Sequence, residues 1–369
     1  MLFRSEARFG AAAYAKLQRI TCEEWVSYLQ WLRRMFDLPV ENGVKVDTFE
    51  PEGALFRLAG RRNGKPETWY CRRLILASGP LSTGGTSIPE AIVAGLPRAK
   101  YGHVYDSHID FDALKGKSII MIGCGASGFD NSGTALESGA ARVDMLVRRP
   151  AIPRVSYIRW TDWSAFLNTF ADLDDEQKWK MASWVQKNHS PPPGRALERV
   201  DKRPDFHIHF NSPITSARVE GDKVVLVTPN GEHRADHVLC ATGFSFRLDR
   251  APLFAKVWPH IALWKDRYTP KEAGGSEKFP YSPYVGRHYE FIEKNPGEAP
   301  WLKHVYCFTQ AATLSMGPTG RVSGLKYGVR RLLMGVSQSF FQEDFDLHLK
   351  SIERYADSEF DDHPWVAKA

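Results

Sequence analysis

One short stretch of the sequence has residue types and spacing that suit the binding of a dinucleotide. Gly123, Gly125 and Gly128 form a complete G-x-G-x-x-G. In such a loop the first glycine allows a sharp turn, the second lets the backbone approach a diphosphate, and the third lets the next helix pack closely on the strand. The positive end of that helix then faces the phosphates. We therefore expect dinucleotide contacts from Gly123, Gly125, Ala126, Ser127 and Gly128.

The sequence around the loop predicts the elements that must position it. Residues 118–122 are an unbroken apolar run, typical of a buried parallel strand. Residues 129–138 predict a helix that Gly139 ends, and residues 143–147 form a second apolar run. A βαβ unit of about 30 residues has the expected size. A glycine-rich turn in some other α/β unit is the alternative, but the order of elements favours a dinucleotide.

The end of the second strand predicts which nucleotide binds. An acidic residue there accepts hydrogen bonds from the ribose of NAD, whereas an arginine accommodates the 2′-phosphate of NADP. The sequence has Arg148 and Arg149 at this point, and its nearest acid, Asp144, lies inside the strand. Two guanidinium groups can clamp a dianionic phosphate. We therefore predict NADP(H), with solvated arginines at a strand end as the alternative.

Two further strands end in two small residues followed by glycine. The motif Ala-Ser-Gly at 77–79 follows a strand predicted over 69–76, and Ala-Thr-Gly at 241–243 follows one predicted over 235–239. Each comes after a hairpin with an Asn-Gly turn. Such a strand end lets the backbone approach another group closely. The repetition predicts two related dinucleotide-binding units between which the chain crosses here, with cofactor contacts from Ser78, Gly79, Ala241, Thr242 and Gly243.

Length and composition indicate an ordinary globular protein. The 369 residues suggest about two domains, and the net charge of +6 comes from scattered residues, so no nucleic-acid face is predicted. The five cysteines include no C-x-x-C, which disfavours a disulfide framework, a zinc site and a dithiol pair. We predict that they are buried in a reducing compartment. No metal site is predicted.

The sequence has no apolar run long enough to cross a bilayer. Its N-terminus lacks the apolar core of a signal peptide. We therefore predict a soluble, cytoplasmic protein.

Local patterns predict several other elements. Thr21 and Glu24 form a capping box before a helix whose aromatic stripe, beginning at Trp25, is predicted to face the core. The acidic run at 174–176 is interpreted as a helix start rather than a catalytic carboxylate pair. Residues 315–320 lead into a helix predicted over 322–342. The start of that helix presents amides to an anion in one interpretation, and is an ordinary capped start in the other.

These residues together resemble the class B flavoprotein monooxygenases, the flavin-containing and Baeyer–Villiger type. The resemblance covers nearly the whole chain and includes residues 25–31, 77–80, 123–128, 148–149, 241–244 and 283–331. It implies an α/β fold with two Rossmann-like dinucleotide-binding domains, in which an NADP domain interrupts an FAD domain. The implied arrangement is part of the FAD domain at 1–80, the NADP domain at 81–243 with its βαβ unit at 117–148, and a return to the FAD domain at 244–369.

The sequence departs from the family pattern in two places. The family's FAD domain begins with its own G-x-G-x-x-G, yet Gly10 is the only glycine before Gly43. We therefore expect the N-terminal FAD-binding βαβ unit to be missing from this sequence, as in a fragment or a short form. In the connector at 81–116, Tyr101-Gly102 and His108 do not fall in the register of the family's Phe-x-Gly and His fingerprint, which leaves the subfamily open.

The resemblance implies the chemistry. NADPH reduces FAD, and the reduced flavin takes up O2 as a C4a-hydroperoxide that oxygenates a small organic substrate. Because the flavin carries this chemistry, we assign no general acid or base; His103 and His108 are candidates only, since a loop histidine is more often solvated or hydrogen-bonded. Four aromatic residues either line a substrate cleft or pack in the core, which is the favoured interpretation: Trp160, Trp163, Tyr284 and Phe308.

Other functions remain as alternatives. The first is an NADP-binding fragment or pseudoenzyme without flavin chemistry. The second is a flavin-independent NADP dehydrogenase, which is disfavoured because no Tyr-x-x-x-Lys pair follows the glycine loop. A disulfide reductase is disfavoured by the missing C-x-x-C. The sequence predicts neither the substrate nor the oligomeric state.

Overall fold

The computed structural model describes residues 20–107, 109–271 and 275–357, together with Gly10, Glu359 and Trp365. The chain divides into two compact units, residues 1–47 with 58–69, and residues 48–57 with 70–369. Within the described residues, no helix combines the length and the apolar character that crossing a bilayer demands. The boundaries expected after residues 80 and 243 stay predictions.

The helix α3, Cys22–Met35, opens with the predicted capping box. The Glu24 amide donates to the Thr21 hydroxyl over 3.2 Å, and the Thr21 amide donates to the Glu24 carboxylate over 2.9 Å. The prediction that its aromatic stripe faces a core is wrong, because α3 has no buried residue and Trp25 is 38% exposed. Periodicity shows that one face is apolar, and does not show that another element covers it. The sequence predicts mainly helix over residues 1–40, but residues 1–9 and 11–19 lie outside the described residues.

A β-meander follows, and it contains the predicted hairpin with an Asn-Gly turn. The strands are β1 (Val44–Glu52), β2 (Leu55–Arg62) and β3 (Lys65–Cys71), in the order β1-β2-β3. Asn63 and Gly64 form the tight turn between β2 and β3, both with positive φ, 49° and 82°. That conformation is the one that Asn-Gly favours in a two-residue hairpin loop.

A five-stranded parallel sheet forms the centre of residues 101–240. Its order is β5-β12-β6-β7-β8, and every neighbouring pair is parallel. The strands are β5 (Tyr101–His103), β6 (Ser118–Ile122), β7 (Arg142–Leu146), β8 (Phe206–His209) and β12 (His237–Cys240). The predicted βαβ unit is confirmed, with α5 (Ala126–Glu137) between β6 and β7. The helix begins three residues before the predicted Phe129, since Gly125 itself is the N-cap.

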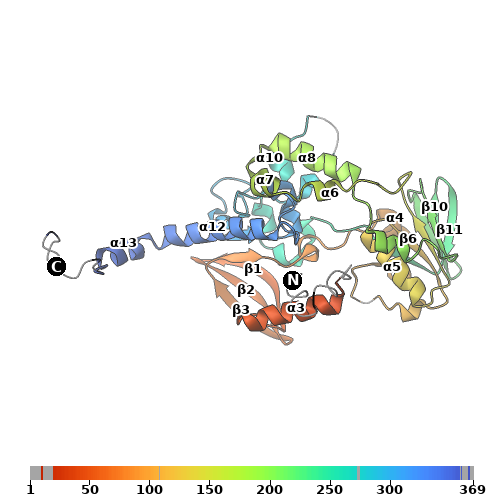
Figure 1. Ribbon diagram of the computed structural model, residues 1–369, viewed down its shortest axis with the longest axis horizontal. Helices are drawn as coiled ribbons and strands as arrows, with labels where there is room; N and C mark the ends of the chain where they lie inside the picture. Colours follow the sequence, from red (N-terminus) through yellow and green to blue (C-terminus); the bar gives the residue numbers. More distant parts are fainter. Residues whose placement is uncertain are drawn as a thin grey trace. The chain divides into compact units, whose positions relative to one another are not determined.

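Alternate residues of β6 face two different layers, as strand geometry requires. Ile119 and Met121 pack in a core with residues of α5 and of α9 (Gly194–Glu198). Ile120 and Ile122 pack in a second core with residues of α4 (Glu90–Gly95) and of a three-stranded antiparallel sheet. That sheet has the order β11-β10-β9, made of β9 (Ser216–Glu220), β10 (Lys223–Thr228) and β11 (Gly231–Ala235). In Figure 1, α4, α5, β10 and β11 surround β6.

The connector predicted at 81–116 contains regular structure that the sequence did not reveal. It contributes β5, at the edge of the central sheet, and α4. These elements have three and six residues, too few for a hydrophobic period to stand out from the surrounding glycines and prolines.

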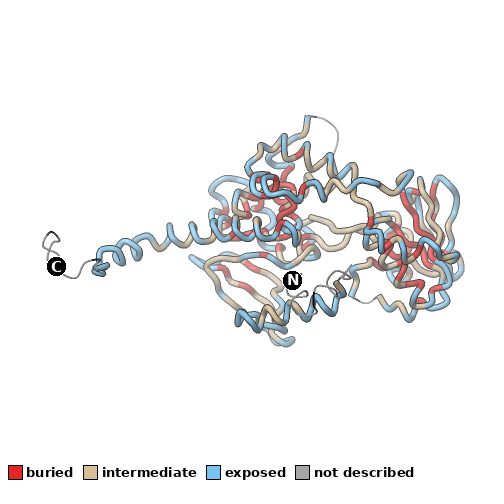
Figure 2. Tube along the Cα trace, viewed as in Figure 1, coloured by how far each residue is buried: buried red, intermediate tan, exposed pale blue. Residues whose placement is uncertain are grey.

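The rest of the described chain combines helices with long loops. Two short strands, β4 (Leu74–Leu76) and β13 (Val305–Cys307), pair in parallel. The helices are α6 (Tyr157–Trp160), α7 (Ser164–Thr169), α8 (Asp175–Asn188), α10 (Trp264–Arg267), α11 (Thr313–Met316), α12 (Leu325–Glu343) and α13 (Phe345–Glu353). Asp174 caps α8 with Gln177, which confirms the predicted helix start. Figure 2 shows α13 exposed along its length, and it has no buried residue.

The cysteines agree only in part with the prediction that all five are buried. Cys240 and Cys307 are buried, whereas Cys71 and Cys124 are half-buried and Cys22 is exposed. Cys22 lies on α3, whose exposure accounts for the difference.

Candidate functional site

The glycine loop has the backbone geometry that its sequence predicts. Gly123 follows β6 directly and has a φ of 103°, in the region that favours glycine. A Cβ at Gly123 would lie 2.8 Å from the carbonyl oxygen of Ala241. A Cβ at Gly128 would overlap the carbonyl oxygen of Gly123. These two glycines let the helix, the loop and the end of β12 approach one another closely.

Gly125 is the glycine that faces open space. It is the N-cap of α5, makes no side-chain capping hydrogen bond, and has no atom within 4 Å of the place where a Cβ would stand. The first amides of a helix have no partner within the helix, and the helix dipole makes this end positive. The start of α5, at Ala126 and Ser127, therefore offers donors and room to an anion.

The carboxyl ends of three strands bring several predicted site residues together. Ile122 on β6 is paired with Leu146 on β7 and with Cys240 on β12. The residues that follow these strands therefore meet at one edge of the sheet, which is where open α/β sheets bind ligands. They are the Gly123 loop, Arg148 with Arg149, and Ala241 with Thr242 and Gly243.

Ser78 and Gly79 lie elsewhere, at the end of β4. Gly79 has a φ of 77° and no atom within 4 Å of a Cβ position, so a ligand has room beside this backbone. The segment after Gly79 pairs with the segment after the Ala241 motif. The Ser87 amide donates to Gly243 over 2.8 Å, and the Ser245 amide donates to Gly85 over 2.9 Å. The two glycine motifs are thus joined by a two-stranded ribbon.

Two arginine side chains follow β7 and are free to bind an anion. Within the described residues, neither the Arg148 nor the Arg149 side chain forms a hydrogen bond or an ion pair. Burial lowers the pKa of Arg149, and the neighbouring charge of Arg148 lowers it further. Asp144, by contrast, is already engaged inside the strand, where it accepts hydrogen bonds from Arg142 over 2.8 Å and pairs with His209 over 2.7 Å. This carboxylate is therefore not available to a ribose.

The candidate histidine His103 is not a loop residue. It ends β5 and is completely buried, and its ring lies 6.3 Å from that of Phe244. Its Nδ1 accepts a hydrogen bond from the Tyr105 amide over 3.2 Å. Burial lowers the pKa of His103, so the imidazole is held neutral. The other candidate, His108, lies outside the described residues.

The four aromatic candidates divide into two pairs. Tyr284 packs 5.1 Å from Trp264 and donates to Asp175 over 3.0 Å, and Phe308 packs 4.9 Å from Tyr289. Core packing was the wrong expectation for the other two, because Trp160 is 59% and Trp163 is 50% exposed. Their rings contact each other at 5.9 Å between centroids, on a short segment that lacks a covering layer.

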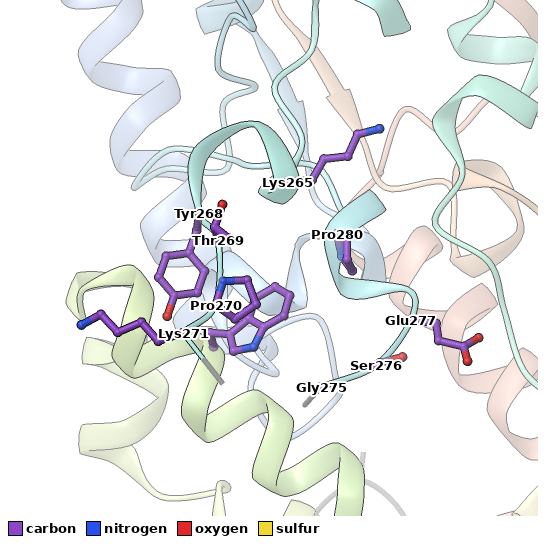
Figure 3. A pocket seen from close by; sticks show the side chains of 10 residues that line it. Lys265, Tyr268, Thr269, Pro270, Lys271, Gly275, Ser276, Glu277 and Pro280 are labelled. Carbon is purple, nitrogen blue, oxygen red and sulfur yellow. The ribbon is translucent and has the colours of Figure 1, made fainter. Parts of the chain in front are cut away.

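The surface also has a hollow of about 530 Å³ beside α8 and α10. Figure 3 shows its lining residues Lys265 and Lys271 extending in opposite directions. The Lys271 ammonium pairs with Glu176 over 3.0 Å. Without convergent polar groups this hollow is a weaker candidate than the edge of the central sheet. None of the predicted site residues lines it.

Comparison with known proteins identifies the family. The family model for L-lysine 6-monooxygenase/L-ornithine 5-monooxygenase matches residues 3–191. The FAD-dependent urate hydroxylase of Xanthomonas campestris pv. campestris is 33% identical over 358 residues, which are 96% of this chain and 75% of that protein. The chain belongs to the lysine/ornithine monooxygenase family.

Solved structures of flavin monooxygenases share the fold. The Kutzneria ornithine N-hydroxylase, solved with reduced FAD, NADP+ and L-ornithine, gives a TM-score of 0.67 at 14% identity, over 92% of this chain and 82% of that one. The ornithine hydroxylase of Pseudomonas aeruginosa gives 0.66 at 17% identity, over 92% and 81%. The predicted α/β fold with two dinucleotide-binding domains is confirmed.

This lysine/ornithine monooxygenase family member is an NADPH- and FAD-dependent monooxygenase. The predicted class B flavoprotein family, the enzyme class and both cofactors are thereby confirmed. Its reaction takes a small-molecule substrate and O2. Bound FAD supplies the redox chemistry that activates O2, and the protein binds and orients the reactants.

The residues fit the cofactors to different extents. The Gly123 loop offers the space, the amides and the cations that NADPH needs. The open backbone at Gly79, at the carboxyl end of β4, fits close approach by FAD. The motif G-x-G-x-x-G occurs once in residues 1–369, at Gly123 to Gly128. That loop can contact the diphosphate of one dinucleotide.

Proposed function

We propose that this monooxygenase hydroxylates a planar, anionic nitrogen heterocycle of the urate type. The substrate, NADPH, a proton and O2 give the hydroxylated substrate, NADP+ and water. The observation that carries this proposal is the 33% identity over 96% of the chain with a protein named for urate hydroxylation. The similar structures with ornithine-type substrates are 14% and 17% identical, and support the fold alone.

On this proposal NADPH binds at the edge of the central sheet. Its diphosphate lies on the loop from Gly123 to Gly128, against Gly125 and the first amides of α5. Arg148 and Arg149 hold the 2′-phosphate, and the motifs at 77–79 and 241–243 approach the cofactors from the ends of their strands. The open space at Gly125 and the lack of any other partner for the two arginines in the described structure support this placement.

One cation favours an anionic substrate. Within the described residues, Nη1 of Arg321 is buried and has no hydrogen-bond partner. Burial lowers the pKa of Arg321, and the charge of Asp162 opposes this. A guanidinium with unused donors recognises planar anions and stacks on aromatic rings.

N-hydroxylation of an amine is the second candidate function. The observation in its favour is the match of the lysine/ornithine monooxygenase model to residues 3–191. That match covers the glycine loop and the two arginines, and ends before Arg321 and the rest of the C-terminal third. It therefore bears on the cofactor more than on the substrate.

The test compares substrates in one assay. Purified protein with added FAD and NADPH receives urate, ornithine, lysine or cadaverine, and NADPH oxidation is measured together with the mass of the product. We expect urate to disappear and its product to gain one oxygen atom. A hydroxylated amine, with urate unchanged, would instead establish the second candidate.

We also propose a cytoplasmic location and no nucleic-acid partner. Both agree with the free thiols of all five cysteines and with a net charge of only +6. Fractionation of cells that express a tagged copy tests the location.

A further inference from the structure

A strained backbone marks a histidine that neither the glycine loop nor the arginine motif includes. His189 ends α8 as its C-cap, with φ 48° and ψ 173°. Backbone in this region is otherwise almost confined to glycine, and a residue with a side chain persists there only when its surroundings hold it. Glycine would remove the strain, so the presence of histidine points to a use for its side chain.

The fold places His189 beside the segment that carries the two arginines. The next residue, Ser190, accepts a hydrogen bond from the Ser156 hydroxyl over 3.3 Å. One turn earlier in α8, Trp184 packs edge-on against Tyr157, with 6.3 Å between ring centroids. These two contacts fix the end of α8 on the residues that follow Arg149. The charges of Arg149 and Arg148 both act on the imidazole.

The surroundings of His189 keep it neutral while no anion is present. Burial lowers its pKa, the charges of Arg149 and then Arg148 lower it further, and together they bring it to about 4. Within the described part of the chain, no acidic side chain acts on this imidazole. The other groups that act on the arginines are the half-buried thiol of Cys124 and the ammonium of Lys278. Cations therefore gather here from two segments of the chain, and among the described residues that act on them Glu277, beside Lys278, is the carboxylate that opposes their charge.

We propose that His189 is a third ligand of the 2′-phosphate of NADP(H), and that it takes up a proton from solvent when the phosphate binds. This rests on the proposed placement of the nucleotide at Arg148 and Arg149. The two negative charges of the phosphate offset the two arginines that keep the imidazole neutral. The imidazolium then donates a charge-assisted hydrogen bond to a phosphate oxygen.

Proton uptake makes the preference for NADP(H) depend on pH. A group whose pKa is higher in the complex than in the free protein strengthens binding at low pH, and that contribution is lost as pH rises through its pKa in the complex. Affinity for NADP+ should therefore fall by up to about tenfold per pH unit across that range. NAD+ has no 2′-phosphate, so its affinity should not follow this slope.

The experiment is calorimetry of NADP+ and NAD+ binding to the purified, FAD-supplemented protein. Each titration is repeated in two buffers with different ionisation enthalpies, because the difference reports the number of protons taken up. We expect proton uptake with NADP+ and none with NAD+. In His189→Gln the uptake and the pH slope should disappear, and NADP+ should bind roughly tenfold more weakly.

Two controls separate ligand binding from structure. His189→Gly relieves the strained backbone, so it should melt at a higher temperature than the wild type while losing the same affinity for NADP+. A merely structural histidine would not combine these two effects. His260→Gln changes a histidine that is 42% exposed in its side chain and outside the cluster, and should leave proton uptake unchanged.

Two results would overturn the proposal in distinguishable ways. If NADP+ binds no better than NAD+ to the wild type, the nucleotide site itself is misplaced and the role of His189 fails with it. If Arg148→Ala abolishes the preference for NADP+, but the wild type takes up no proton and His189→Gln binds like the wild type, the site stands and His189 is not its ligand.

Discussion

Two helices of the second unit, α5 and α12, differ in what stands at their first turn. Each has a glycine N-cap, Gly125 or Gly324, and no side-chain capping hydrogen bond. Around Gly125 the space is open, whereas a Cβ at Gly324 would lie 2.8 Å from the carbonyl oxygen of Pro318. The chain itself therefore fills the start of α12.

An uncapped helix start is therefore not by itself an anion site. At α5 the loop keeps the backbone away and the amides can meet a ligand. At α12 the preceding turn, which contains Arg321, covers the helix end. Of the two interpretations of the α12 start, this geometry favours the one without a bound anion at the amides.

The first prediction breaks the α5 loop. In Gly128→Val the new side chain overlaps the carbonyl oxygen of Gly123, so helix and strand must separate. We expect a loss of about 3 kcal/mol in the free energy of unfolding and no measurable binding of NADPH. Urea denaturation measures the first effect, and fluorescence titration with NADPH measures the second.

Gly125→Ala is its matched control. Nothing stands within 4 Å of the new Cβ, so the stability should change by less than about 1 kcal/mol. Binding of NADPH should nevertheless weaken, because the methyl group occupies the space proposed for the diphosphate. Unchanged binding in this variant would contradict the proposed placement.

The second prediction concerns the charges beside the loop. Replacing both Arg148 and Arg149 by alanine should weaken NADPH binding at least about 100-fold, because each of the two charge-assisted hydrogen bonds contributes about 1.5–3 kcal/mol. NADH binding should hardly change. An equal loss for both nucleotides would show that the arginines do not recognise the 2′-phosphate.

The third prediction concerns Asp236, which precedes β12 and is hydrogen-bonded to Ser118 at the start of β6. Burial raises the pKa of Asp236, but hydrogen bonds from Lys223 and Ser118 outweigh it and hold the pKa at about 2. A lowered pKa stabilises the fold above the ordinary value of 3.8, and that stability is lost as pH falls toward 2. Asp236→Asn should cost about 2 kcal/mol at pH 7. In denaturation curves, the difference from the wild type should shrink below pH 4.

The fourth prediction sharpens the contrast at α12. Arg321→Met removes a buried cation with an unused donor, so the melting temperature should stay the same or rise. On the proposed function, the KM for urate should increase roughly tenfold while the affinity for NADPH stays unchanged. A parallel loss of NADPH binding would place Arg321 at the nucleotide instead.

What the sequence predicted well was local. Gly123 and Gly128 are required by a positive φ and a close approach that only glycine permits, so their spacing carries the geometry with it. The Thr21 and Glu24 cap is equally local, because both partners lie within one turn. The placement of Arg148 follows from the length of a regular strand.

What the sequence did not predict depends on neighbours distant along the chain. The exposure of Trp160 and of α3 depends on whether another segment covers them. The three-residue strand β5 forms because β12 provides its hydrogen-bond partners. Nothing in the sequence indicated that His189 is unusual. Only its backbone angles, and two arginines that are far away in sequence but close in the fold, distinguish it from any histidine at a helix end.

The ribbon that joins the two glycine motifs has a mechanical consequence. Residues 85–87 and 243–245 are hydrogen-bonded side by side, and the Thr242 hydroxyl also donates to the Ser87 carbonyl. A Cβ at Gly84 would collide with the Arg247 amide. Two hydrogen-bonded strands resist twisting more than a single tether does, so the five-stranded sheet should swing about this ribbon in one preferred plane.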